Sequence, residues 1–238
     1  MELLPRLDYP IVVLVAGAWH GGWAWRRVAP ALAAYGWPVE VIELPSTAPA
    51  GLPRCGLHDD AAVIRQQVMR FVEKHSAPAV VVAHSYAGAA ATEGLAGVDA
   101  VQHLIYLAAH LLDVDESVLG IGTPPWWRFD RDMIIASHPL DLFFSDVPRR
   151  DARWAVEQLQ PTSHAAFGES LQAAAWHTIP STYVICELDH AFPVVLQERF
   201  ALRAGTVERL NTGHSPFLAR PAELTQLIID IAGKAEKV

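Results

Sequence analysis

An apolar run that stops abruptly at a serine constrains the fold of this chain more than any other feature. Residues 79–83 read Ala-Val-Val-Val-Ala, Ser85 follows one position later, and a stretch of small residues covers 86–96. A short run of β-branched residues is typical of a strand whose two faces are both buried, as in a parallel sheet. The small residues after Ser85 suit a helix packed closely on that strand. The pattern therefore predicts a strand, a tight turn at the serine and a helix.

The rest of the chain repeats this alternation of strands and helices. Further strands are predicted over residues 11–17, 39–44, 101–108, 182–187 and 205–210. Helices are predicted over residues 24–35, 63–72, 194–202 and 224–232, with Asp59 and Asp60 capping the second of them. Such alternation is typical of an α/β fold, a mainly parallel sheet with helices on both faces.

Residues 111–178 break the rhythm. This segment is rich in Trp, Pro and His, and its apolar spacing is helical or irregular, as in residues 152–159 and 170–176. We interpret it as an insertion, the lid, that covers the carboxyl edge of the sheet, where open parallel sheets bind ligands. The expected organisation is one domain, with residues 1–110 and 179–238 forming the core.

Residues 83–88, Ala-His-Ser-Tyr-Ala-Gly, resemble the nucleophile elbow G-x-S-x-G, with alanine in its first place and Ala87, followed by Gly88, in its last. Small residues are required there because the turn is tight and the strand and helix approach each other closely. The turn lifts the hydroxyl of Ser85 out of the sheet and places the next N–H at a helix start, where negative charge is stabilised. The alternative is an ordinary serine at a helix N-terminus.

A nucleophilic serine needs a histidine base and an acid that orients it. In the chain order that accompanies this elbow, the acid and then the histidine follow the serine. Asp189 follows the strand predicted over residues 182–187, and His214 lies between the last strand and the last helix. Asp113 is the rival acid, and Glu187 is expected to remain on its strand.

The loop after the first strand is the expected source of a second oxyanion donor. Gly17 and Gly21-Gly22 allow its backbone to approach a substrate closely. The candidate donors are the backbone N–H groups of Ala18 and Tyr86. The loop matches neither G-x-G-x-x-G nor the P-loop, which argues against a nucleotide site.

Four motifs together resemble the α/β-hydrolase superfamily, and more narrowly its small capped esterases, which include plant methyl-ester hydrolases, hydroxynitrile lyases and bacterial esterases. The motifs are Gly17-Ala18-Trp19-His20-Gly21-Gly22-Trp23, Ala83-His84-Ser85-Tyr86-Ala87-Gly88, Cys186-Glu187-Leu188-Asp189 and Gly213-His214-Ser215-Pro216-Phe217. The resemblance implies an α/β-hydrolase fold over nearly the whole chain. The family usually has a histidine where Ala16 stands, so the oxyanion loop is expected to be braced differently here.

The resemblance also separates esterases from lyases. In the lyases it implies a threonine in the first loop and a lysine directly after the catalytic histidine, where this chain has Gly17 and Ser215. The predicted activity is therefore hydrolysis of a carboxylic ester through an acyl-enzyme. Ser85, Asp189 and His214 are the predicted catalytic residues.

The lid and the first loop supply the candidate substrate contacts, which are Trp19, Trp126 and Trp127. Clustered aromatics and few cations favour a small, mostly apolar ester, such as a methyl or aryl ester or a lactone. No cofactor or metal is expected, since no histidine pair has a metal-ligand spacing. Non-hydrolytic use of the same pocket, as a lyase, cyclase or small-molecule receptor, remains the alternative because fold does not determine function.

Composition excludes several other classes. The net charge is 18 − 26 = −8 with no basic run, which argues against nucleic-acid binding. No apolar run has the length of a membrane span, and residues 1–6 show no secretion signal. With only two cysteines, a cytoplasmic protein is the expectation. The oligomeric state is left open, a homodimer included.

Overall fold

The computed structural model describes residues 9–48 and 55–235 of the 238-residue chain. The start of the chain, read above for a secretion signal, lies outside the described residues. So does the central part, residues 49–54, of the loop that follows the second strand.

The predicted parallel sheet is present and has six strands in the order β2-β1-β3-β4-β8-β9, with every pair parallel. The strands are β1 (Ile11–Val15), β2 (Val39–Ile42), β3 (Ala79–His84), β4 (Val101–Leu107), β8 (Ser181–Cys186) and β9 (Thr206–Leu210). β1 and β3 lie inside the sheet, and all their residues are buried. Their continuous apolar sequences follow from this burial on both faces.

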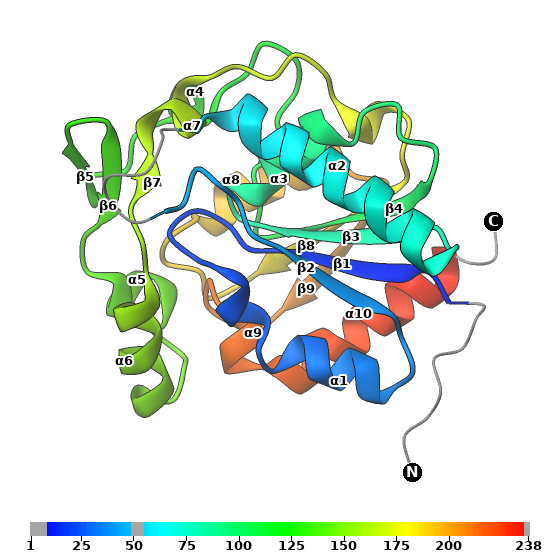
Figure 1. The fold of residues 1–238 in the computed structure, drawn as a ribbon. Coiled ribbons are helices and arrows are strands. Elements are labelled where there is room, and N and C mark those ends of the chain that lie inside the picture. The colour runs from blue at the N-terminus through cyan, green and yellow to red at the C-terminus, as the bar shows by residue number, and fades with distance from the viewer. Residues whose placement is uncertain (1–8, 49–54, 236–238) are drawn as a thin grey trace.

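Helices cover both faces of the sheet (Figure 1). α2 (Leu57–His75) and α3 (Ala87–Gly94) pack together over one face, and α1 (Val28–Ala34) and α10 (Pro221–Ala235) lie together against the other. The remaining core elements are the short turn η1 (Gly22–Trp25), α8 (Val194–Ala201) and α9 (Pro216–Ala219), and the short turn η2 (Ala175–His177) lies at the end of the lid segment. The expected α/β architecture is therefore confirmed. Among the described residues, no helix is both long and apolar enough to cross a membrane.

The first helix is shorter than predicted. In place of one helix over residues 24–35, the chain forms η1 and then α1, which begins at Val28. Pro30 explains the break, because a proline lacks the N–H that a helix interior requires but is tolerated in a first turn. Asp59 and Asp60 do not cap α2 from outside. They lie within its first turn, where Asp59 accepts a hydrogen bond from the Gly56 N–H.

The lid contains a structure that the sequence pattern did not predict, a three-stranded antiparallel sheet of β5 (Trp127–Asp130), β6 (Met133–Ala136) and β7 (Thr162–Ser163). Around it lie α4 (Val118–Ile121), α5 (Pro139–Phe143), α6 (Arg149–Gln158) and α7 (His164–Gly168). β5, β6, α5 and α6 lie to one side of the central sheet, at the left in Figure 1.

Of the two readings of residues 152–159 and 170–176, helical or irregular, the first segment is helical, as part of α6, and the second is irregular until the η2 turn at its end. The backbone of this second segment instead forms hydrogen bonds with residues distant in sequence. The Leu171 N–H donates to the Glu116 carbonyl, and the Leu171 carbonyl accepts from Asp115. These long-range bonds replace the local ones that a helix would need.

Candidate active site

Ser85 lies at the turn between β3 and α3, with a φ of +54°. A left-handed conformation is uncommon for a residue other than glycine and is typical of a sharp strand-to-helix turn. Gly88 permits the close approach, because a Cβ at this position would lie 2.8 Å from the Ala109 Cβ and from the His110 carbonyl oxygen. The methyl group of Ala83 is buried within β3 without disturbing its pairing to β1 and β4.

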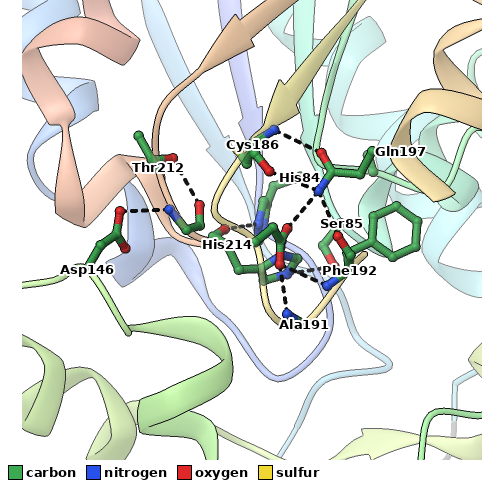
Figure 2. Close-up of polar contacts among 12 residues, drawn as sticks. His84, Ser85, Asp146, Cys186, Ala191, Phe192, Gln197, Thr212 and His214 are labelled. Carbon is green, nitrogen blue, oxygen red and sulfur yellow. Dashed lines mark hydrogen bonds and ion pairs between the residues drawn. The ribbon is translucent and has the colours of Figure 1, made fainter. Parts of the chain in front are cut away.

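The structure brings Ser85, His214 and Asp189 together in one hydrogen-bonded chain, of which Ser85 and His214 are labelled in Figure 2. His214 Nε2 lies 3.2 Å from Ser85 Oγ, and His214 Nδ1 lies 2.7 Å from Asp189 Oδ2. A carboxylate only accepts hydrogen bonds, so Nδ1 carries the proton and Nε2 is free to accept from the serine hydroxyl. The three residues are 8%, 3% and 6% exposed, which keeps this chain largely out of water.

The carboxylate of Asp189 is held on its other side as well. Oδ1 accepts from the backbone N–H groups of Ala191 and Phe192, each at 2.8 Å, and Oδ2 accepts from the Gln197 amide at 3.1 Å. Gln197 is fully buried and also bonds the backbone of Cys186 and Phe192 (Figure 2). These donors stabilise the charged carboxylate and fix its orientation.

The two rival acids lie elsewhere. Asp113 pairs with His177 at 3.0 Å, and Glu187 pairs with Arg209 at 3.5 Å. β8 ends at Cys186, so Glu187 is already off the strand, one residue earlier than predicted. Neither carboxylate hydrogen-bonds His214.

His84 supports the backbone of His214. Its Nε2 donates to the His214 carbonyl at 2.9 Å, and the two ring centroids are 4.6 Å apart. Burial places the pKa of His84 well below the ordinary value, and the nearby His214 acts in the same direction. A neutral His84 therefore places no positive charge beside His214.

The loop after β1 passes directly over the elbow. A Cβ on Gly17 would lie 2.7 Å from the Ser85 Cβ and 3.1 Å from the Tyr86 backbone nitrogen, so only glycine fits. The adjacent Ala18 N–H and the Tyr86 N–H have no acceptor among the described residues. Two unpaired donors beside the serine hydroxyl are what an oxyanion hole requires.

His20 braces this loop, in which Ala16 replaces the family's usual histidine. Its Nδ1 donates to the Ala18 carbonyl at 2.8 Å, and its backbone N–H donates to the Gly17 carbonyl at 3.2 Å. Burial lowers the pKa of His20 to about 3, so the ring stays neutral. Trp19, which lies between Ala18 and His20, donates its backbone N–H to Thr162 Oγ1 at 2.8 Å. The peptide groups on both sides of Ala18 are therefore held.

A cavity of about 470 Å³ lies above Ser85 and His214. All three predicted substrate contacts, Trp19, Trp126 and Trp127, line it, and the rings of the latter two lie 5.5 and 6.2 Å from that of Trp19. Trp127 is the first residue of β5. None of the described residues that line the cavity is Lys, Arg, Asp or Glu, so the space suits an uncharged molecule.

Sequence reasoning missed several residues at this site. Asp60 accepts from the Tyr86 hydroxyl at 2.6 Å and from the Ser46 N–H at 2.9 Å, and burial raises its pKa to about 6. Asp146 in the lid accepts from the N–H of Gly213, next to His214, at 2.7 Å. No local pattern marks these residues, or Gln197, because each acts on a segment distant in sequence.

Comparisons with known proteins agree with this architecture. A family model described as alpha/beta hydrolase family matches residues 12–227. Alpha/beta hydrolase nvfD from Aspergillus novofumigatus is 28% identical, with 96% of this chain and 99% of the relative aligned. Methylesterase 18 from Arabidopsis thaliana is 25% identical, with 92% and 96% aligned. The crystal structure of a pyrethroid hydrolase from Sphingobium faniae JZ-2 is similar with a TM-score of 0.80 at 20% identity, over 96% of this chain and 99% of that one.

Proposed function

The chain belongs to the alpha/beta hydrolase family, and on that premise we propose that it is a serine esterase that cleaves small, uncharged carboxylic esters through an acyl-enzyme. The observation that carries the proposal is the continuous hydrogen-bonded chain from Ser85 Oγ through His214 to Asp189. The names of two similar proteins, a methylesterase and a pyrethroid hydrolase, support the same reaction type.

In the proposed mechanism, Ser85 Oγ attacks the ester carbonyl while His214 Nε2 takes the hydroxyl proton. Asp189 holds the imidazole and stabilises its positive charge. The Ala18 and Tyr86 N–H groups bind the developing oxyanion. His214 then gives the proton to the departing alcohol, and later accepts one from the water that hydrolyses the acyl-enzyme.

The shape and polarity of the cavity support a small substrate with apolar groups. Its walls are mainly aromatic and aliphatic, and its volume of about 470 Å³ is in the usual range for small-molecule sites. A methyl or aryl ester or a lactone fits this description. An anionic substrate does not, because no cation among the described lining residues would balance its charge.

The test is turnover of short-chain p-nitrophenyl esters by the wild type and by Ser85→Ala. We expect Ser85→Ala to lower kcat/KM by at least about 10³-fold with the fold intact. Ser163→Ala is the matched control, because Ser163 is also buried and its hydroxyl has no partner. Covalent labelling of Ser85 without ester turnover would favour the non-hydrolytic alternative, a lyase, cyclase or receptor.

A further inference from the structure

His110 is a buried titratable residue at the cavity that the proposed mechanism does not use. It lies just beyond the end of β4 and lines the same cavity as Ser85 and His214. Its backbone N–H donates to the Ser85 carbonyl at 3.0 Å, which ties it to the elbow. Its ring packs against Phe192 and Phe200, with centroids 4.6 and 6.1 Å away, so its position is fixed by the core.

One polar atom of this ring is not satisfied by the protein. His110 Nδ1 is buried and has no hydrogen-bond partner among the described residues. The buried His20 and His84 each donate one ring N–H to a backbone carbonyl and also leave the other ring nitrogen unpaired, but neither lines the cavity as His110 does. An unsatisfied buried polar group destabilises the fold. A phenylalanine would pack between the same two rings without that penalty.

The charge state of the ring defines what it can bind. Burial lowers the pKa of His110 to about 4 despite the opposing effect of the Ser85 backbone, and the nearby His214 acts in the same direction as burial. The imidazole is therefore neutral at neutral pH and presents one donor and one acceptor. A carboxylate or phosphate would need a cation instead, and none of the described lining residues is Lys or Arg.

Most other polar side chains of the cavity are engaged or exposed. The Tyr86 hydroxyl is turned away to Asp60, His190 is exposed and contacts the Asp141 carbonyl, and Thr123 is exposed. Trp127 Nε1 is a second buried group without a partner among the described residues, but an indole N–H only donates. The wall beside His110 consists of Ala191, Phe192, Pro193 and Leu196. His110 is thus a buried polar group in an apolar wall, and such an arrangement fixes the orientation of a bound ligand.

We propose that His110 determines specificity by hydrogen-bonding a hydroxyl group of the substrate, so that the preferred substrates are hydroxy esters. A hydroxyl both donates and accepts, so it satisfies either ring nitrogen, and it adds no charge to the cavity. This inference rests on the proposed esterase function and names its substrate class. The His110 ring takes no part in proton transfer, and it acts by orienting the ester relative to Ser85.

The experiment compares isosteric ester pairs. For the acyl arm, p-nitrophenyl 3-hydroxybutyrate is compared with p-nitrophenyl 3-methylbutyrate, and for the alcohol arm, 2-hydroxypropyl benzoate is compared with isobutyl benzoate. We expect the wild type to favour the hydroxy ester in one pair by about tenfold in kcat/KM, which corresponds to one net hydrogen bond. His110→Phe should bring that ratio close to one by slowing the hydroxy ester alone. His110→Gln, which keeps a donor and an acceptor, should retain part of the preference.

Leu196→Met is the control from the same wall, and it should change both members of a pair alike. The inference is overturned if the wild type shows no preference in either pair, or if His110→Phe keeps the wild-type ratio. If the wild type hydrolyses none of the four esters, the proposed esterase function itself is wrong. Turnover of the methyl isostere by His110→Phe verifies that the variant retains a working site.

Discussion

The side-chain amide of Gln197 donates to Asp189 Oδ2 at 3.1 Å and to the Phe192 carbonyl at 2.7 Å, while its oxygen accepts from the Cys186 N–H at 2.9 Å. One fully buried side chain thus connects the end of β8, the Asp189 carboxylate and the loop before α8. We regard Gln197 as a positioning residue, because it contacts the acid and not the cavity.

Gln197→Leu should lower kcat about 10- to 100-fold with a small change in KM, because the orientation of Asp189 is loosened while the cavity is unchanged. Steady-state kinetics with a p-nitrophenyl ester, together with the pH profile of kcat, measure this effect. Gln226→Leu, at an exposed position on α10, is the control and should behave as the wild type. A pure rise in KM would contradict the positioning role.

Asp189→Asn should lower kcat/KM by at least about 10²-fold, because an amide at this position favours the wrong tautomer of His214 and cannot stabilise the imidazolium. The same substitution at Asp113, the rival acid from the sequence, should have little effect, since Asp113 pairs with His177 away from His214. Measuring kcat/KM for Asp189→Asn and Asp113→Asn with the same ester shows which of the two residues is the acid. Equal losses would show that the acid has been assigned wrongly.

Asp146 connects the lid to the loop that carries His214. Asp146→Ala leaves the Gly213 N–H without its acceptor, which should destabilise the fold by about 1–3 kcal/mol and lower kcat about tenfold. Asp146→Asn keeps a side-chain oxygen that can accept from the Gly213 N–H, so it should retain most of the wild-type stability and most of the wild-type kcat. Urea unfolding and kinetics of the two variants measure the effects, with Asp141→Asn, at an exposed position on α5, as the control. Wild-type behaviour of Asp146→Ala would show that this link is dispensable.

The buried neutral histidines predict sensitivity to acid. Burial lowers the pKa of His110 from 6.5 to about 4, so between these values the unfolded chain binds a proton that the folded chain does not. The contribution of His110 to the free energy of unfolding is therefore fully present above pH 6.5 and is lost as the pH falls from 6.5 towards 4. At pH 5, about 1.5 pH units below the ordinary pKa of 6.5, the free energy of unfolding is lower by about 2 kcal/mol. The lowered pKa of His20 acts in the same direction.

His110→Phe should therefore lose about 2 kcal/mol less stability than the wild type between pH 7.5 and pH 5, measured by urea unfolding. His138→Asn is the control, because His138 is exposed and its φ of +53° is one that asparagine tolerates. This variant should show the wild-type loss. An identical loss in His110→Phe would show that the His110 imidazole is not held neutral by burial.

Much of the core architecture was predictable because its signals are local. Continuous apolar runs such as residues 79–83 identify strands buried on both faces, and the observed β3 extends this run by only one residue. The meeting of Ser85, Asp189 and His214 in space was predictable because each follows a strand whose carboxyl end lies at the same edge of the sheet. Their order along the chain, serine then acid then histidine, indicated which role to expect for each residue.

The lid and the supporting residues were not predictable in the same way. β5, β6 and β7 are short, and β7 forms where Thr162 and Ser163 meet β6, a pairing without a local pattern. Asp60 reads as a capping residue at the start of α2, yet its carboxylate is bound by Tyr86, 26 positions away. Burial against partners distant in sequence decides such positions, and one sequence does not show those partners.

The central claim is that Ser85 is the nucleophile of the site. Its most direct test is intact-protein mass spectrometry after reaction with a p-nitrophenyl alkylphosphonate, followed by peptide mapping. The account predicts one phosphonyl group per chain, on the peptide that contains Ser85, no adduct on Ser85→Ala, and greatly slowed labelling of His214→Gln. Labelling at another residue, or equal labelling of wild type and Ser85→Ala, would contradict it.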